Sequence, residues 1–253
     1  MARPFVCGNW KMYVDLKETK EIIKFFKDQS LSLKLVDIVL CPPYLYIPLL
    51  ADAFSATAIK IGAQDVFWEE KGAYTGAISP SEIADFADYV IIGHSERRQY
   101  FAETDEQINK KIKASLEAGL KPIVCVGETL EDYRAANHDV VTNQLLADLA
   151  GINAEKGKNI IIAYEPVWAI GSDKPADEMY ANQICLRIRQ AVSSLFGKNQ
   201  AKNTKILYGG SVNSSNAAKF VAQSEIDGLL VGGASVKPEE FYKIVDSVSK
   251  VKT

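Results

Sequence analysis

Histidine and cysteine are scarce in this 253-residue sequence, which has two histidines and four cysteines. The cysteines lie far apart and form no Cys-x-x-Cys pair, so the ligand spacing of an ordinary zinc site is missing and we expect no metal. Thiols within apolar runs are typical of reduced core cysteines, which favours a cytoplasmic protein. The four are Cys7, Cys41, Cys125 and Cys185.

Long hydrophobic runs are missing as well. No apolar stretch approaches the roughly 20 residues that a membrane-spanning helix needs. The first residues, MARPFVCGNWKM, lack the basic, apolar and small-residue regions of a secretory signal. The formal net charge is only −3, so the strongly basic face of a protein that binds nucleic acid or an anionic membrane is absent. We therefore expect neither partner, and any anionic ligand must be held by local groups.

The sequence does contain a regular alternation of apolar runs and amphipathic stretches. Continuously apolar runs are typical of parallel strands that are covered on both faces. They span residues 4–8, 36–40, 59–63, 89–93, 121–127, 159–164, 205–210 and 227–233. Helical spacing lies between them, for example at 16–28, 105–118, 177–196 and 238–250. Eight such units without a linker predict an α/β protein with one (β/α)8 barrel domain over residues 1–253. A doubly wound open sheet is the alternative, but no Gly-x-Gly-x-x-Gly follows the first run.

Reactive side chains cluster where the predicted strands end, which is where such barrels carry their active sites. Asn9 and Lys11 follow the first run, and His94, Ser95 and Glu96 follow the fourth. Further candidates follow the later runs, namely Glu128, Glu165, Gly209, Gly210, Ser211, Gly232, Gly233 and Ala234. The GHSER segment fails the Gly-x-Ser-x-Gly pattern at its last position, so a serine hydrolase is disfavoured.

Two of these candidates suit acid–base chemistry, and the paired glycines suit an anion. Glu165 ends an apolar run, and partial desolvation should raise its proton affinity, as a general base requires. Backbone N–H groups in glycine pairs after the last two strands can hold a phosphate. Each residue has a structural alternative: a buried ion pair for Glu165, a hydrogen-bonded structural role for His94, and simple turns for the glycines.

The segment from Gln64 to Pro80 is a long loop that carries several aromatic residues. Long loops in compact barrels are usually functional, and exposed aromatic side chains favour contact with a partner. We expect an oligomer contact, although the loop could instead fold onto its own surface.

Six sequence blocks follow one another along the chain: GNWKM at 8–12, GHSERR at 93–98, CVGE at 125–128, AYEPVWAIG at 163–171, LYGGSV at 207–212 and LVGGAS at 230–235. Taken together and in this order, they resemble triosephosphate isomerase over the whole chain. The resemblance implies a single-domain TIM barrel. It also implies interconversion of dihydroxyacetone phosphate and D-glyceraldehyde 3-phosphate, in glycolysis and gluconeogenesis, without a cofactor.

The resemblance also implies roles for individual residues. Glu165 would move a proton between neighbouring carbons through an enediol or enediolate, and a neutral His94 would polarise the carbonyl. Lys11 would offset negative charge, Asn9 would donate a hydrogen bond to a substrate oxygen, and Glu96 would organise this group.

The phosphate-binding groups and the lid likewise follow from the resemblance. The phosphate would bind backbone N–H groups of Gly171, Ser211, Gly232 and Gly233. Residues 166–176 would form a closing lid. Asp173 and Pro175 depart from the lid pattern of the family and remove backbone freedom near its trailing end.

A homodimer is implied too, with Thr75 of one chain reaching towards Lys11 of the other. The family usually has Asn at position 65 and Glu at position 77, where this chain has Asp65 and Ala77. Because the carboxylate at 77 is missing, we expect Arg98 to pair elsewhere, for instance with Asp65, and the dimer to be weaker than usual.

Two other functions remain as alternatives. One is a phosphate-binding barrel isomerase that acts on another substrate, and the other is a non-catalytic barrel kept for binding. The set Asn9, Lys11, His94 and Glu165 disfavours both, because phosphate-binding loops alone would not require it.

Overall fold

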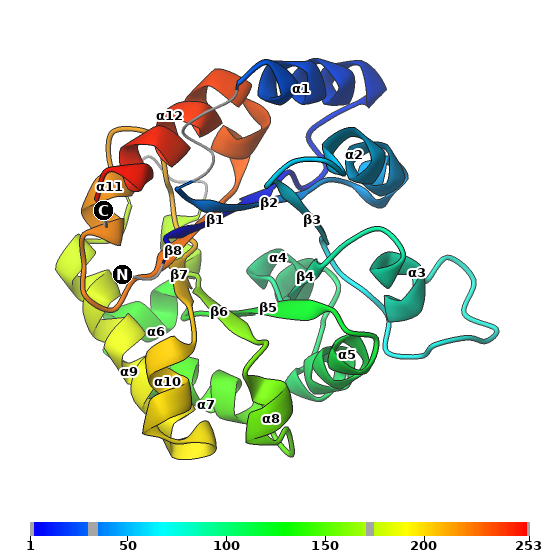
Figure 1. Ribbon diagram of the computed structural model, residues 1–253. Coiled ribbons are helices and arrows are strands. Elements are labelled where there is room, and N and C mark those ends of the chain that lie inside the picture. The colour runs from blue at the N-terminus through cyan, green and yellow to red at the C-terminus, as the bar shows by residue number, and fades with distance from the viewer. Residues whose placement is uncertain (1–2, 30–34, 171–174, 252–253) are drawn as a thin grey trace.

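The computed structural model describes residues 3–29, 35–170 and 175–251. Eight parallel strands form a closed barrel in chain order, with β1 paired to both β2 and β8 (Figure 1). The strands are β1 (Phe5–Asn9), β2 (Asp37–Cys41), β3 (Lys60–Ala63), β4 (Tyr89–Ile92), β5 (Lys121–Val126), β6 (Ile161–Tyr164), β7 (Ile206–Tyr208) and β8 (Gly228–Val231). The predicted (β/α)8 barrel is confirmed, and the open sheet is excluded because β1 pairs with β8.

Helices surround the barrel on its outer side (Figure 1). They are α1 (Leu16–Asp28), α2 (Ile47–Phe54), α3 (Pro80–Ala84), α4 (Ser95–Tyr100), α5 (Asp105–Glu117), α6 (Leu130–Arg134), α7 (Asp139–Asp148), α8 (Ala154–Gly157), α9 (Glu178–Phe196), α10 (Lys198–Asn203), α11 (Ala217–Val221) and α12 (Pro238–Ser249). Short 3-10 helices lie at Tyr44–Tyr46, Val167–Ala169 and Gly233–Val236. The four helical ranges expected from the sequence match α1, α5, α9 and α12 to within a residue or two.

Local sequence accounts for where several helices begin. In α1, the Asp15 side chain accepts the N–H of Glu18 while the Glu18 carboxylate accepts the N–H of Asp15, which is a complete capping box. The same reciprocal arrangement begins α5 at Thr104 and Gln107. Pro238 occupies the first turn of α12, where its missing N–H costs nothing.

The core has two layers because neighbouring strand residues point to opposite faces of the barrel. One layer fills the barrel with side chains such as Cys7, Ile123 and Leu207. The other packs Val6, Leu40 and their equivalents against the helices. Both faces are buried, which explains why the strands read as continuously apolar runs.

The four cysteines are all buried and free, and the sulfurs of Cys7 and Cys41 lie 3.6 Å apart. Within the part of the chain that the structure describes, no helix has the length and apolar character needed to cross a membrane.

Candidate active site

Most of the site residues expected from the sequence face one cavity of about 310 Å³ at the carboxyl ends of the strands. Those in its lining are Asn9, Lys11, His94, Glu165, Ser211, Gly232 and Gly233. Glu96 does not line the cavity, but it bonds to Lys11, which does. Gly171 and the lid residue Asp173 lie outside the described residues. The barrel therefore brings together groups from β1, β4, β6, β7 and β8.

Glu165 directly follows β6 and is only 2% exposed. Its Oε1 lies 3.0 Å from Nε2 of His94, and its Oε2 accepts the N–H of Ser95 at 2.9 Å. Burial acts to raise the pKa of Glu165, but His94, the Ser95 N–H and Lys11 together bring that pKa below its usual value. The expected rise in the proton affinity of Glu165 is therefore wrong for this arrangement, because hydrogen-bond donors and positive charge contact the buried carboxylate.

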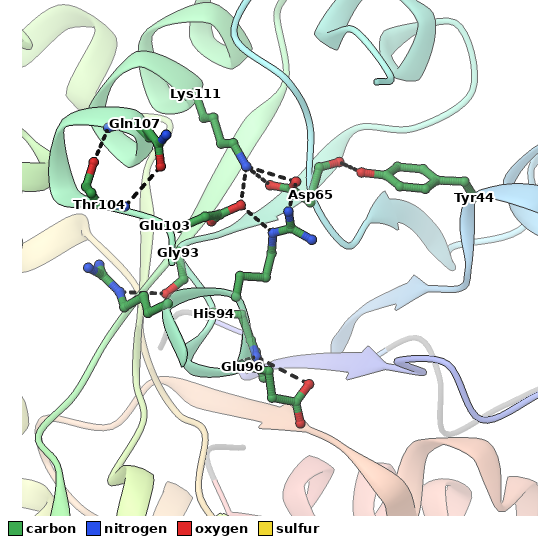
Figure 2. Close-up of polar contacts among 11 residues, drawn as sticks. Tyr44, Asp65, Gly93, His94, Glu96, Glu103, Thr104, Gln107 and Lys111 are labelled. Carbon is green, nitrogen blue, oxygen red and sulfur yellow. Dashed lines mark hydrogen bonds and ion pairs between the residues drawn. The ribbon is translucent and has the colours of Figure 1, made fainter. Parts of the chain in front are cut away.

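His94 is the N-cap residue of α4, and its Nδ1 accepts the N–H of Glu96 at 3.2 Å. The same Nδ1 lies 3.7 Å from Oε2 of Glu96, the contact drawn between these two residues in Figure 2. An Nδ1 that accepts a hydrogen bond leaves the ring proton on Nε2, which then donates to Glu165. Burial acts to lower the pKa of His94, but the Glu165 carboxylate outweighs burial and raises that pKa. The charge state of the ring therefore depends on whether Glu165 stays beside it.

Lys11 brings a positive charge to the same cavity. Its Nζ lies 2.5 Å from Oε1 of Glu96, and its backbone N–H donates to Oδ1 of Asn9 at 3.0 Å. Its φ of 49° lies in the left-handed region, which few non-glycine residues adopt. Lys11 also neighbours Gly232, since a Cβ added at that glycine would lie 3.4 Å from Cε of Lys11.

The glycine-rich turns after β7 and β8 complete the cavity. A Cβ added at Gly233 would meet no atom within 4 Å, so this backbone borders open space. A Cβ added at Gly209 would lie 3.1 Å from Cγ of Glu165, so the glycine leaves room for that carboxylate. The Ser211 hydroxyl donates to the carbonyl of Ala169 at 2.9 Å, which ties the turn after β7 to the segment after β6. Backbone N–H groups and a lysine around one cavity form a suitable anion site.

Glu128 is a candidate for which the sequence predicts no role, and the structure shows that it holds the segment around Glu165. It is fully buried after β5, and its Oε1 accepts hydrogen bonds from Tyr164 at 2.8 Å, Trp168 at 2.8 Å and Tyr180 at 3.1 Å. Tyr164 and Trp168 flank Glu165 in the sequence. Glu128 therefore holds the chain on both sides of that carboxylate. The only sequence signal was a carboxylate at the end of an apolar run.

The expected pairing of Arg98 with Asp65 is wrong, because the neighbouring Arg97 makes that contact, at 2.9 Å. Arg98 instead bonds to Asp105 at 2.5 Å and to Asp148 at 2.7 Å. Successive residues of a helix project about 100° apart. Arg97 therefore faces the end of β3 and Arg98 faces α5 and α7.

The aromatic residues of the long loop pack against one another with their rings tilted. The ring centroid of Phe67 lies 4.1 Å from that of Trp68 and 4.8 Å from that of Tyr74. Thr75 and Ala77 at the loop tip are exposed. The loop is partly self-packed, as the alternative interpretation held, while its tip stays accessible to a partner.

Within the described ranges 3–29, 35–170 and 175–251, no cluster of three His, Cys, Asp or Glu side chains could hold a metal ion. The fold and cavity define a (β/α)8-barrel protein that sets a carboxylate, an imidazole and a lysine beside an anion site. The family model described as triosephosphate isomerase matches residues 4–248, and the chain belongs to that family.

Curated relatives agree with this assignment. The triosephosphate isomerase of Dictyoglomus turgidum is 47% identical over 249 residues, which cover 98% of this chain and all of the relative. That of Dictyoglomus thermophilum is also 47% identical with the same coverage. That of Alkaliphilus metalliredigens is 46% identical and covers 97% of this chain and all of the relative. The resemblance noted in the six sequence blocks is confirmed.

Proposed function

We propose that the protein interconverts dihydroxyacetone phosphate and D-glyceraldehyde 3-phosphate through an enediol or enediolate, as an intramolecular aldose–ketose isomerase of glycolysis and gluconeogenesis. Family membership supplies the reaction. The observation that carries the proposal for this chain is the contact between the Glu165 carboxylate and Nε2 of His94, in a cavity that Lys11 and Gly232 also line.

Glu165 is the proposed base. In the resting arrangement the N–H of Ser95 and Nε2 of His94 hold it ionised. To reach a substrate carbon, the carboxylate must leave these two donors. Burial then dominates its environment and makes it more basic, so it takes a proton from the carbon beside the carbonyl and returns it to the neighbouring carbon.

His94 is the proposed electrophile. When a substrate oxygen replaces Glu165 at Nε2, the contact that raised the pKa of the ring is lost. Burial and the N–H of Glu96 at Nδ1 remain, and both favour a neutral ring. A neutral ring donates from Nε2 to the oxygen that gains negative charge and passes protons between the two oxygens.

Lys11 offsets the charge of the enediolate and of the phosphate, and Glu96 holds the lysine through the 2.5 Å ion pair. Asn9 donates to a substrate oxygen. We assign the phosphate to the backbone N–H groups of Ser211, Gly232 and Gly233, together with Gly171. Glu165 and His94 carry out the proton transfers by themselves, so the mechanism needs no cofactor or metal.

We further propose a homodimer in which the tip at Thr75 enters the neighbouring chain near the partner's Lys11. Met12 beside Lys11 is 95% exposed, and Leu45 is 85% exposed. Tyr100 and Phe101 at the end of α4 are exposed too. Large apolar side chains gathered around the loops at one end of a barrel favour burial against a partner.

We also propose that the chain forms one domain and that the protein is located in the cytoplasm. All eight strands, from Phe5 to Val231, belong to one barrel, which favours a single domain over residues 1–253. Four free, buried thiols suit a reducing compartment, and we propose the cytoplasm.

The experiment that tests the reaction measures isomerisation of glyceraldehyde 3-phosphate by the purified protein, with the product reduced in a coupled assay. Glu165→Gln keeps the shape of the side chain and removes the base, so we expect kcat to fall by about 100-fold or more. Glu128 is unsuitable as a control because it touches the same segment, so Glu131→Gln on the exposed face of α6 serves instead. Equal rates for the wild type and Glu165→Gln would contradict the proposal and favour another substrate or a binding role.

A further inference from the structure

Arg98 holds the turn through which β4 passes into helix α4, and this turn carries His94. Nε of Arg98 donates to the carbonyl of Gly93 at 2.9 Å, the bond drawn at Gly93 in Figure 2. Gly93 directly precedes His94, and its φ of 72° lies in the left-handed region. A Cβ added at Gly93 would lie 3.2 Å from Nη2 of Arg98, so the guanidinium packs against this turn. The place of Arg98 therefore bears on the place of His94.

The same guanidinium also reaches the neighbouring strand. Its Nη2 donates to the carbonyl of Cys125 on β5 at 3.2 Å, so Arg98 joins the end of β4 to β5. Helix α4 is only six residues long, and Ser95 is its one buried residue, so little apolar packing holds the helix itself. Helices in proteins owe most of their stability to tertiary contacts. Helix α4 therefore depends on how firmly its arginines are held.

Two carboxylates neutralise Arg98, and they differ in exposure. Oδ1 of Asp105, at the start of α5, lies 2.5 Å from Nη1, but that side chain is 41% exposed. Oδ2 of Asp148, the last residue of α7, lies 2.7 Å from Nη2, and that side chain is fully buried. Water and salt screen an exposed pair more than a buried one. Asp148 is therefore the counter-ion that holds Nη2, the atom that also bonds to β5.

The fold fixes Asp148 in this place at a cost in free energy. Nδ2 of Asn109 on α5 donates to the carbonyl of Asp148 at 2.8 Å and to that of Ala150 at 3.0 Å, which ties the end of α7 to α5. Oδ1 of Asp148 is buried and has no hydrogen-bond partner among the described residues. Burial of such an oxygen is unfavourable, and proteins keep costs of this kind at functional places. Stability alone does not account for this carboxylate.

We propose that Asp148 is a positioning residue for the isomerase reaction, acting through Arg98 on the turn at Gly93 and thus on His94. Ala77 offers Arg98 no carboxylate, so the counter-charge of this arginine comes from Asp105 and Asp148 of its own chain. The proposal rests on the proposed function. It extends that function to α7, which contributes none of the described residues that line the cavity.

The titration of Asp148 supports a pH dependence of this hold. Burial raises the pKa of Asp148 to about 7, while Arg98, facing it from α4, lowers that pKa and Asp105, facing it from α5, raises it. Helix α9 also packs against α7, but its Arg187 pairs with Asp139 at the other end of α7. Acidification through about pH 7 therefore neutralises Asp148 and weakens its hold on Arg98.

The main test compares Asp148→Asn with Asp139→Asn, the same change at an exposed carboxylate of the same helix. At about pH 8 the wild-type Asp148 is ionised, and we expect kcat of Asp148→Asn to be lower by about 10-fold to 100-fold, the loss typical of a small displacement of reacting groups. At about pH 5 the wild-type Asp148 is neutral too, so the two kcat values should converge. Asp139→Asn should match the wild type at both pH values.

The KM of Asp148→Asn should stay within about twofold of the wild type, because the glycine turns proposed to hold the phosphate follow β7 and β8. A double-mutant cycle tests the route through the arginine. Arg98→Gln should lower kcat by itself, and adding Asp148→Asn should change kcat by less than about twofold, because Asp148 acts through Arg98. A full further loss in the double variant would contradict that route.

A readout that does not depend on activity is the ¹⁵N signal of the His94 ring. The chain has two histidines, so His138→Gln assigns the spectrum. In Asp148→Asn at about pH 8 we expect the Nε2 signal of His94 to shift, while the signal of His138 stays and the urea unfolding midpoint does not fall. A merely structural residue would lower the midpoint and leave the His94 signal in place.

Wild-type kcat at about pH 8 with an unshifted His94 signal in Asp148→Asn would overturn the proposal. A loss of kcat that comes with a lower unfolding midpoint and an unshifted His94 signal would overturn it as well. A wild type without isomerase activity would refute the proposed function instead, and the His94 signal would still decide whether Asp148 positions the turn at Gly93.

Discussion

The pKa values of individual carboxylates in this barrel reflect a balance between burial and the groups that contact each of them. Glu165 is almost fully buried, yet its pKa is lowered because His94 and the Ser95 N–H contact it. Asp148 is also fully buried, but its pKa is raised to about 7, since burial and Asp105 outweigh the opposing effect of Arg98. The balance between burial and the charges and hydrogen-bond donors around each carboxylate decides the direction of its pKa shift.

Asp148 yields a prediction on stability. Its pKa when folded is about 7 and its ordinary value is 3.8, so the folded protein binds the proton more tightly than the unfolded chain. This contribution to stability is complete below pH 3.8 and is lost as the pH rises through about 7. Asp148→Asn removes the titration. We expect the free energy of unfolding of the variant, relative to the wild type, to rise by about 2 to 4 kcal/mol between pH 5 and pH 8.

Urea unfolding at several pH values measures this difference. Asp139→Asn, at an exposed carboxylate of the same helix, is the control and should show no such trend. Oδ1 of Asp148 is buried without a hydrogen-bond partner among the described residues, which is why its charge is costly. A constant difference across the pH range would show that Asp148 does not titrate there.

At the scale of elements, the segments near the site are short and are held by side chains from other elements. The turn Val167–Ala169 after Glu165 depends on Glu128, which follows β5. Helix α4 depends on Arg97 and Arg98. Because these anchors come from segments after other strands and from helices α5 and α7, the position of each site segment is a property of the closed barrel.

Glu128→Gln should therefore destabilise the protein and lower kcat together. The glutamine keeps one acceptor for the three donors, but loses the negative charge that strengthens those hydrogen bonds. We expect the free energy of unfolding to fall by about 1 to 3 kcal/mol. Chemical denaturation and the coupled assay measure the two effects. Preserved stability with lost activity would show that Glu128 acts on the site alone.

At the scale of the whole molecule, the exposed loops at the carboxyl end of the barrel lead to the proposed dimer. Sedimentation at micromolar concentration should give twice the mass of the chain. Thr75→Arg places a bulky cation where the loop tip would meet the partner's Lys11, so we expect dissociation and a parallel loss of activity. The same change at Thr142, a partly exposed residue of α7, should leave the mass unchanged. A wild-type monomer would refute the dimer.

The sequence alone predicts much of the fold and of the candidate site. Apolar runs flanked by amphipathic stretches predicted eight strands and their helices, because strands buried on both faces must be apolar throughout. The reactive residues after those runs predicted one shared cavity, since parallel strands end at the same edge. Asn9, Lys11, His94 and Glu165 all line it.

The sequence by itself therefore determined the barrel, its strand order and the end of the barrel that carries the chemistry, because these follow from patterns within each segment. Only the tertiary structure decided that Arg97 rather than Arg98 meets Asp65, and that Glu128 holds Tyr164 and Trp168. It also decided that the pKa of Glu165 is lowered rather than raised. These outcomes depend on helix rotation and on groups far apart in the chain, which become neighbours only when β1 closes on β8.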